Sequence, residues 1–103
     1  MVAGADQGDV FKRDMGYSVD EFYRILPSAV GDYEYTVEGD RILVGFPDED
    51  RELVLRIKGL PDRKIGMIRI PRIELEFTFH DFSAEERKEF MVVFDRSFQR
   101  GGG

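Results

Sequence analysis

Apolar and polar residues alternate strictly over residues 72–80, which read Arg-Ile-Glu-Leu-Glu-Phe-Thr-Phe-His. Successive side chains of a β-strand point to opposite faces of the sheet, so every second residue shares a face. The pattern predicts an antiparallel strand with one face in the core and the other in solvent. A helix layer or a second sheet must cover the apolar face. The residues on that face are Ile73, Leu75, Phe77 and Phe79.

Two Ser-x-x-Glu motifs predict where helices begin. In such a capping box the serine hydroxyl accepts a hydrogen bond from the glutamate N–H, and the glutamate side chain accepts one from the serine N–H. Ser18 with Glu21 begins a first helix, which Pro27 is expected to end or kink. Ser83 with Glu86 begins a second helix. The apolar stripes expected to face the core are Phe22, Ile25, Leu26, Ala29 and Val30 in the first helix and Phe90, Met91, Phe94 and Phe98 in the second.

The apolar period changes to two between these helices, which predicts consecutive antiparallel strands. Residues 33–37 and 42–46 alternate on either side of a turn at residues 38–40. Residues 53–58 form the next strand, and the sequence Gly-Leu-Pro-Asp at residues 59–62 predicts the turn that follows it. Connections this short join antiparallel neighbours.

The phase of the alternation changes within residues 63–80. Ile68 and Ile70 occupy even positions, whereas the apolar residues from Ile73 onward occupy odd ones. A one-residue slip at Pro71 would turn both sets toward the core, and proline is tolerated at a bulge because it has no N–H to donate. We therefore expect a bend or a β-bulge at Pro71, with Ile68 and Ile70 facing inward.

Together these elements predict an α+β fold. It consists of a single antiparallel sheet of four or five meander strands, with an N-terminal and a C-terminal helix packed on one face, in the order α-β-β-β-β-α. This outline is similar to the helix-on-sheet layout of a TATA-binding-protein repeat. The likeness is architectural, no shared motif accompanies it, and it implies no function.

The chain is expected to hold one domain between two tails. Residues 1–14 have no apolar periodicity and predict a flexible N-terminal tail, in which Val10 and Phe11 either dock on the domain or add a short edge strand. Residues 15–100 form the single α+β domain, and residues 101–103 form a flexible glycine tail.

The C-terminal sequence Arg100-Gly101-Gly102-Gly103 resembles the Arg-Gly-Gly tail of ubiquitin-like modifiers and the Gly-Gly end of small sulfur carriers. That resemblance implies a carrier function. Those families place the tail after the last strand of a β-grasp fold, however, whereas here it follows a predicted helix. A helix C-cap glycine followed by a flexible end explains the same residues, and we prefer this interpretation.

Composition restricts the environment and the chemistry of the protein. A chain of 103 residues with 42% hydrophobic residues can bury one core. The absence of cysteine excludes disulfides, thiolate metal ligands and a cysteine nucleophile, and it fits a reducing cytoplasm. No apolar run reaches the roughly 18 to 20 residues of a membrane-spanning helix, and the N-terminus has no signal-peptide pattern. We expect a soluble, cytoplasmic protein without a membrane partner.

Charge is distributed unevenly along a chain of net charge −6. Residues 41–72 are basic, with eight basic and five acidic side chains. An anion or nucleic-acid surface there would use the segment 56–72. The acidic chain repels nucleic acid and its aromatic residues alternate into the core, so we expect a solvated, mixed-charge sheet face instead. The candidate binding residues of this segment are Arg56, Lys58, Arg63 and Lys64, with Arg69 and Arg72 nearby.

His80, the only histidine, is the remaining candidate binding residue. Glu76 shares its strand face but lies about 13 Å away along the strand, too far to share one metal. Glu74 and Glu76 are about 7 Å apart, a spacing that any alternating strand produces. Their expected role is cross-strand pairing with Arg69, Arg56 or Lys58.

No GxSxG, HExxH, P-loop or GxGxxG motif is present. We therefore expect no catalytic residue, no metal and no cofactor. The leading hypothesis is a small non-enzymatic binding or accessory module with a protein partner, its oligomeric state left open. The first alternative is an enzyme or small-ligand-binding domain that uses Glu74, Glu76 and His80. The second is anion or nucleic-acid binding through residues 56–72.

Overall fold

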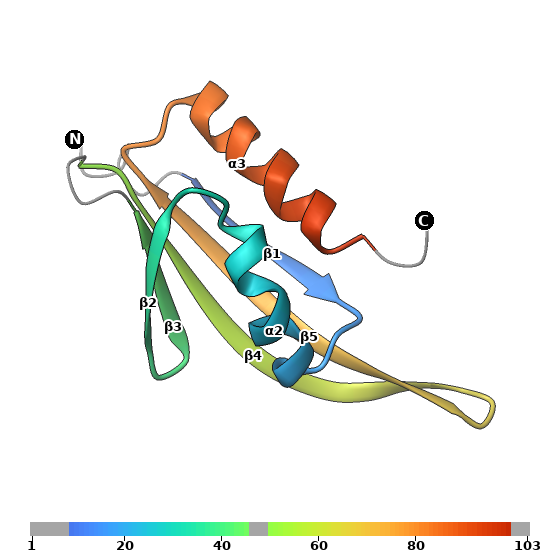
Figure 1. Ribbon diagram of the computed structural model, residues 1–103. Helices are drawn as coiled ribbons and strands as arrows, with labels where there is room; N and C mark the ends of the chain where they lie inside the picture. The colour runs from blue at the N-terminus through green and yellow to red at the C-terminus, as the bar shows by residue number, and fades with distance from the viewer. Residues whose placement is uncertain (1–8, 46–49, 100–103) are drawn as a thin grey trace.

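The computed structural model describes residues 9–45 and 50–99 of the chain. One antiparallel sheet, in the strand order β1-β5-β4-β3-β2, carries two helices (Figure 1). The predicted α+β class is confirmed, and strand β1 stands ahead of the predicted elements. In chain order the elements are β1 (Asp9–Met15), α2 (Val19–Ala29), β2 (Glu34–Glu38), β3 (Arg41–Gly45), β4 (Glu52–Ile65), β5 (Ile68–His80) and α3 (Ala84–Ser97).

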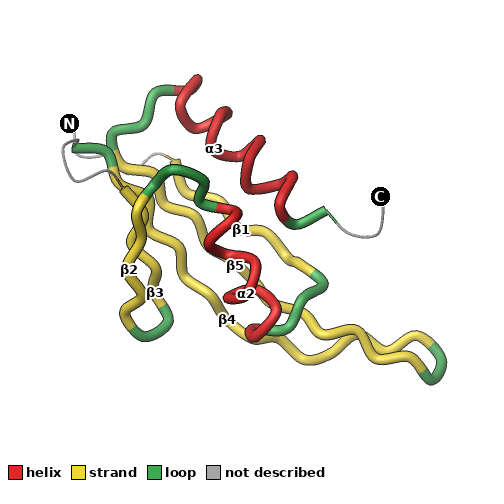
Figure 2. The backbone as a smooth tube through the Cα atoms, in the orientation of Figure 1, coloured by secondary structure: helices red, strands yellow, loops and turns green. Residues whose placement is uncertain are grey.

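Both helices cover the same face of the sheet, as Figure 2 shows. Each begins at a complete capping box, at Ser18 with Glu21 and at Ser83 with Glu86, so both predicted starts are confirmed. Helix α2 continues through Pro27 to Ala29. Pro27 lies in the last turn, so its missing N–H costs one hydrogen bond near the end of the helix rather than in its middle, and the helix ends two residues beyond it.

The core lies between this sheet face and the two helices. The predicted inward residues of β5 are fully buried or nearly so, and those of α3 meet them through aromatic contacts. Phe77 packs edge-on against Phe94, with their ring centroids 5.2 Å apart. Phe22 of α2 stacks on Phe98, the residue that follows α3, with their ring centroids 5.4 Å apart. This contact packs the two helices against each other over the sheet. No polar or charged residue among those described is buried in this core.

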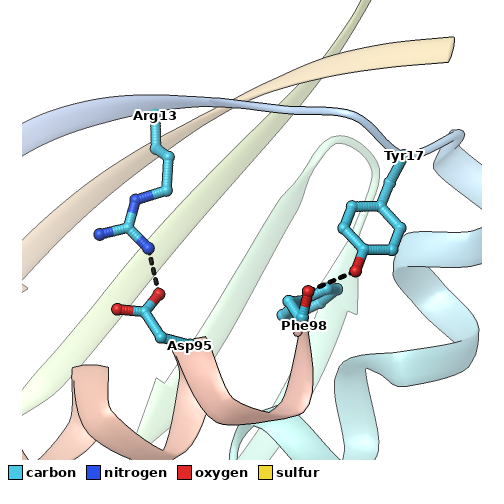
Figure 3. Close-up of polar contacts among 4 residues, drawn as sticks. All are labelled: Arg13, Tyr17, Asp95 and Phe98. Atoms are coloured by element: carbon cyan, nitrogen blue, oxygen red, sulfur yellow. Dashed lines mark hydrogen bonds and ion pairs between the residues drawn. The ribbon is translucent and has the colours of Figure 1, made fainter. Parts of the chain in front are cut away.

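Strand β1 begins inside the segment predicted to be the N-terminal tail. It pairs with β5 along its whole length, and Phe11 stacks on Phe77 with a centroid distance of 4.6 Å. Arg13 forms an ion pair with Asp95 of α3, and the Tyr17 hydroxyl donates to the Phe98 carbonyl oxygen (Figure 3). Residues 9–14 are therefore paired and packed on the sheet, in agreement with the edge-strand alternative.

Two-residue turns that begin with glycine connect β2 to β3 and β4 to β5. Gly39 has a φ of 64° and Gly66 a φ of 61°, a region that side chains with a Cβ rarely adopt. The predicted turn around Gly39 is confirmed. The turn predicted at residues 59–62 is wrong, because β4 continues through them and the chain reverses at Gly66 and Met67.

Strand β2 forms one edge of the sheet, and all five of its residues are exposed. Tyr35 and Val37 lie opposite Val44 and Ile42, so they point to the helix side of the sheet. They remain 37% and 46% exposed because the helices do not extend over this edge.

The glycine tail and Arg100 lie outside the described residues, as do residues 1–8. Neither α2 nor α3, the helices of the described segments, has the length and apolar character needed to span a membrane.

Candidate interaction surface

Strands β4 and β5 extend well beyond the other strands of the sheet. The last pairing of β3 with β4 is at Arg56, and the last pairing of β1 with β5 is at Ile73. Past these residues β4 and β5 pair only with each other, and they form the long projection in Figure 1. We call residues 59–72 the arm. Its projection accounts for the elongated shape of the molecule, which measures 50 × 28 × 25 Å.

A β-bulge marks the base of the arm. Leu60 lies opposite Arg72 and Arg63 lies opposite Ile70, so Pro61 and Asp62 of β4 together face the single residue Pro71 of β5. Neither proline can donate a backbone hydrogen bond, which makes this the position where an irregular ladder costs least. The ladder is irregular at Pro71, as predicted, but the extra residue belongs to β4, so the predicted slip of β5 is wrong.

The tip of the arm is apolar and uncovered. Ile65 lies directly opposite Ile68 and is 55% exposed, while Ile68 is 63% and Met67 is 100% exposed. The prediction that Ile68 and Ile70 face the core is wrong. Strand β5 has no extra residue, so its side chains keep alternating past Pro71, and both isoleucines share the outer face with Arg72 and Glu74. Single exposed apolar residues are common on protein surfaces. Three neighbours at the end of a projection form a local apolar patch of the kind that marks contact sites.

Basic residues flank this apolar tip along both strands. Lys64 lies directly opposite Arg69, and Arg63 lies opposite Ile70. Residues 62–70 carry three basic side chains and one acidic one. Like charges directly opposite each other destabilise a sheet, so strand pairing does not explain why Lys64 and Arg69 face each other. At physiological salt, charges more than about 8 Å apart are largely screened from each other. The negative charge of much of the body therefore has little effect on the cations near the tip.

The base of the arm is attached to strand β1. The Arg72 Nη2 atom lies 3.0 Å from the Asp14 Oδ2 atom. Gly16 lies beside Ile70, since a Cβ built there would be in ordinary contact with the isoleucine side chain at 3.6 Å. These contacts border a shallow hollow of about 170 Å³ and direct the arm away from the body. The residues that line the hollow are Asp14, Met15, Gly16, Arg63, Ile70 and Arg72.

The structure divides the basic residues proposed from the sequence between two places. Arg63 and Lys64 lie on the arm, whereas Arg56 and Lys58 lie on the outer sheet face directly opposite Glu76 and Glu74. The Arg56 Nη2 atom is also 3.9 Å from the Asp40 Oδ2 atom. This outer face has an open hollow of about 290 Å³ with mixed charge. Its lining residues are Lys12, Asp40, Arg56, Ile57, Lys58, Glu74 and Glu76.

His80 lies apart from both basic groups, at the end of β5 farthest from the arm. It faces Glu52 of β4, while Glu74 and Glu76 face Lys58 and Arg56 further along the sheet. No group of three or more His, Cys, Asp or Glu residues that could hold a metal ion occurs within residues 9–45 and 50–99. Within these segments His80 is therefore not part of a metal-ligating cluster.

Arg51 makes polar contacts that the sequence pattern did not reveal. Its guanidinium lies over the rings of Tyr33 and Phe82, at 5.2 and 5.4 Å from their centroids, and its Nη1 atom is 3.1 Å from the Glu86 Oε2 atom. Hydrogen bonding from Ser83 lowers the pKa of Glu86 below its ordinary value, and Arg51 lowers it further. These contacts fix the start of α3 over the sheet, beside an open hollow of about 280 Å³. The sequence offers no local pattern for them because the partners are distant along the chain.

Comparison with known proteins finds no matching family model, no matching curated protein and no matching solved structure.

Proposed function

We propose that this protein is a non-enzymatic binding module that contacts a protein partner through the tip of its arm. The observation that carries the proposal is the exposed apolar group of Ile65, Met67 and Ile68, held away from the body and flanked by basic residues along both strands. We expect it to act in the cytoplasm, the reducing compartment that a cysteine-free chain suits.

The chemistry of the tip supports a protein partner over the other classes. Methionine and arginine are enriched in the buried centres of protein interfaces, where a few apolar anchors supply most of the binding energy. A partner with a small apolar pocket bordered by carboxylates would match Met67 between Arg63 and Arg69. The overall charge of −6 opposes binding to nucleic acid and to anionic membranes at long range.

Site-specific photo-crosslinking in cells tests the proposal and captures the partner in the same step. A photoreactive amino acid replaces Met67 at the tip in one variant and Val92, an exposed residue of α3, in a matched control. Irradiation is expected to give discrete protein adducts at position 67 and none at position 92. The adducts at position 67 should disappear when Arg63 and Arg69 are changed to glutamate.

Three results would overturn the proposal. Nuclease-sensitive adducts at position 67 would assign the arm to nucleic-acid binding, and lipid adducts would assign it to a membrane surface. Equal adduct formation at positions 67 and 92, or none at either, would remove the arm from its role as the contact surface.

A further inference from the structure

The edge of the sheet at β2 has the chemistry that is complementary to the arm. Tyr35 and Val37 are exposed apolar residues on this edge, and among the described strands β2 pairs with β3 alone. Its other side therefore has backbone N–H and C=O groups available to a further strand. Residues 32–40 carry four acidic side chains and no basic one. They are Asp32, Glu34, Glu38 and Asp40.

The arm also has available strand edges. Beyond Arg56 and Ile73, β4 and β5 pair only with each other, so each has one side without a neighbouring strand among the described residues. The arm thus combines free backbone groups, an apolar tip and surrounding cations. The β2 edge combines free backbone groups, exposed apolar side chains and surrounding carboxylates.

From this complementarity we infer that the partner of the arm is a second copy of the same chain, whose β2 edge receives it. The inference rests on the proposed function, because it uses the arm as the contact surface. Ile65, Met67 and Ile68 would pack on Tyr35 and Val37 of the other copy, and the arm cations would lie beside its carboxylates. Two such contacts, exchanged between two copies, would close a symmetric dimer.

Electrostatic repulsion disfavours the two simpler arrangements, in which a β2 edge pairs with a β2 edge or an arm pairs with an arm. Two β2 edges placed side by side would bring Glu34 and Glu38 of one copy close to those of the other, and two arms would bring Lys64 and Arg69 close to their counterparts. Repulsion between like charges disfavours both arrangements, whereas an arm on a β2 edge joins opposite charges. A contact limited to the arm and one strand edge is expected to be weak and reversible, with a dissociation constant on the order of 1 to 100 µM.

Sedimentation equilibrium over a range of protein concentrations measures the self-association directly. The average mass is expected to rise from 11.9 kDa toward twice that value, and the dissociation constant is expected to increase with salt. An arm variant, Arg63→Glu with Lys64→Glu and Arg69→Glu, should remain monomeric. An edge variant, Asp32→Lys with Glu34→Lys and Glu38→Lys, should also remain monomeric.

Mixing the two variants gives the decisive result. In a dimer of either variant alone, the arm and the β2 edge carry charge of the same sign and repel each other. A mixed dimer has one native contact and one contact in which both charges are reversed. A 1:1 mixture is therefore expected to restore the mass of a dimer. The control Lys88→Glu, on the exposed side of α3, should self-associate like the original chain. If circular dichroism shows that a variant is unfolded, a second variant with glutamine at the same residues replaces it. That variant is also expected to lose self-association.

A chain that stays monomeric at several hundred micromolar, well above the weakest dissociation constant expected for this contact, would overturn the inference. So would a mixture that shows no dimer. Neither result affects the proposed function, because adducts between position 67 and a different protein would still support the arm as the contact surface. Adducts between two copies of this chain, joining position 67 to the β2 edge, support both.

Discussion

Strands β4 and β5 lie under the helices in one half of the molecule and have no cover in the other. In the covered half the ladder places Arg56 opposite Glu76, so opposite charges meet on the outer face while apolar residues fill the inner one. In the arm the same ladder places Lys64 opposite Arg69 and leaves its isoleucines in solvent. The covered half is arranged for stability. The arm holds groups that reduce stability, as surfaces intended for contact often do.

The largest expected difference between the two halves comes from Phe77. Its side chain is fully buried between Phe11 and Phe94, so Phe77→Ala should lower the free energy of unfolding by about 3 to 5 kcal/mol through lost burial and the cavity left behind. Urea unfolding followed by circular dichroism measures the change. A loss below about 1 kcal/mol would mean that the covered half is not the source of stability.

Glu86 connects the stability of the covered half to pH. Because the fold lowers its pKa below the ordinary value of 4.5, its contribution is complete above pH 4.5 and is lost as the pH falls through the folded-state pKa. Glu86→Gln should therefore reduce the difference in unfolding free energy between pH 7 and pH 3. Urea titrations at both pH values give this difference for the two proteins. Equal differences would show that Glu86 does not contribute to acid sensitivity.

A smaller effect is expected within the arm itself. Lys64→Glu would place a carboxylate opposite Arg69 and replace repulsion by attraction, which is worth about 0.2 to 1 kcal/mol in a ladder. Amide hydrogen exchange should slow for residues of the arm and remain unchanged at Leu55 and Phe77. Equal slowing in both halves would show that the arm and the covered half open as one unit rather than separately.

The smallest effect is expected at the tip. Met67 is fully exposed, so Met67→Ser should change the free energy of unfolding by less than about 0.5 kcal/mol. The matched substitution Met91→Ser, at a residue that packs partly against the core, should cost clearly more. Thermal unfolding of the two variants provides the comparison, and a larger loss for Met67→Ser would indicate that the tip is covered in the native protein.

Local patterns allowed much of the covered half to be predicted from sequence. The capping boxes at Ser18 and Ser83 involve residues three apart, and the burial of Phe77 follows from the period of its strand. The edge strand at Val10 and Phe11 remained an open alternative. Its pairing with β5 joins residues more than fifty positions apart, which no local pattern specifies.

The arm was harder to predict because its sequence patterns fit more than one local structure. The glycine and proline of residues 59–62 have the composition of a turn, but the same composition suits a bulge where no third strand needs a hydrogen bond from Pro61. The face on which Ile68 lies depends on which of the two strands carries the extra residue of the bulge, and here that strand is β4. That placement is decided by tertiary packing, as is the division of the basic residues between the arm and the outer face.

The end of sheet pairing at Arg56 and Ile73 separates the length of the arm from the integrity of the core. Each inserted pair of facing residues would lengthen the ladder by about 3.4 Å without entering the helix-covered half. Deleting one facing pair, such as Lys64 and Arg69, would also turn the tip residues to the opposite face, because side chains alternate. Evolution can therefore adjust the reach of this protein in discrete steps, with the orientation of the tip reversing at each one.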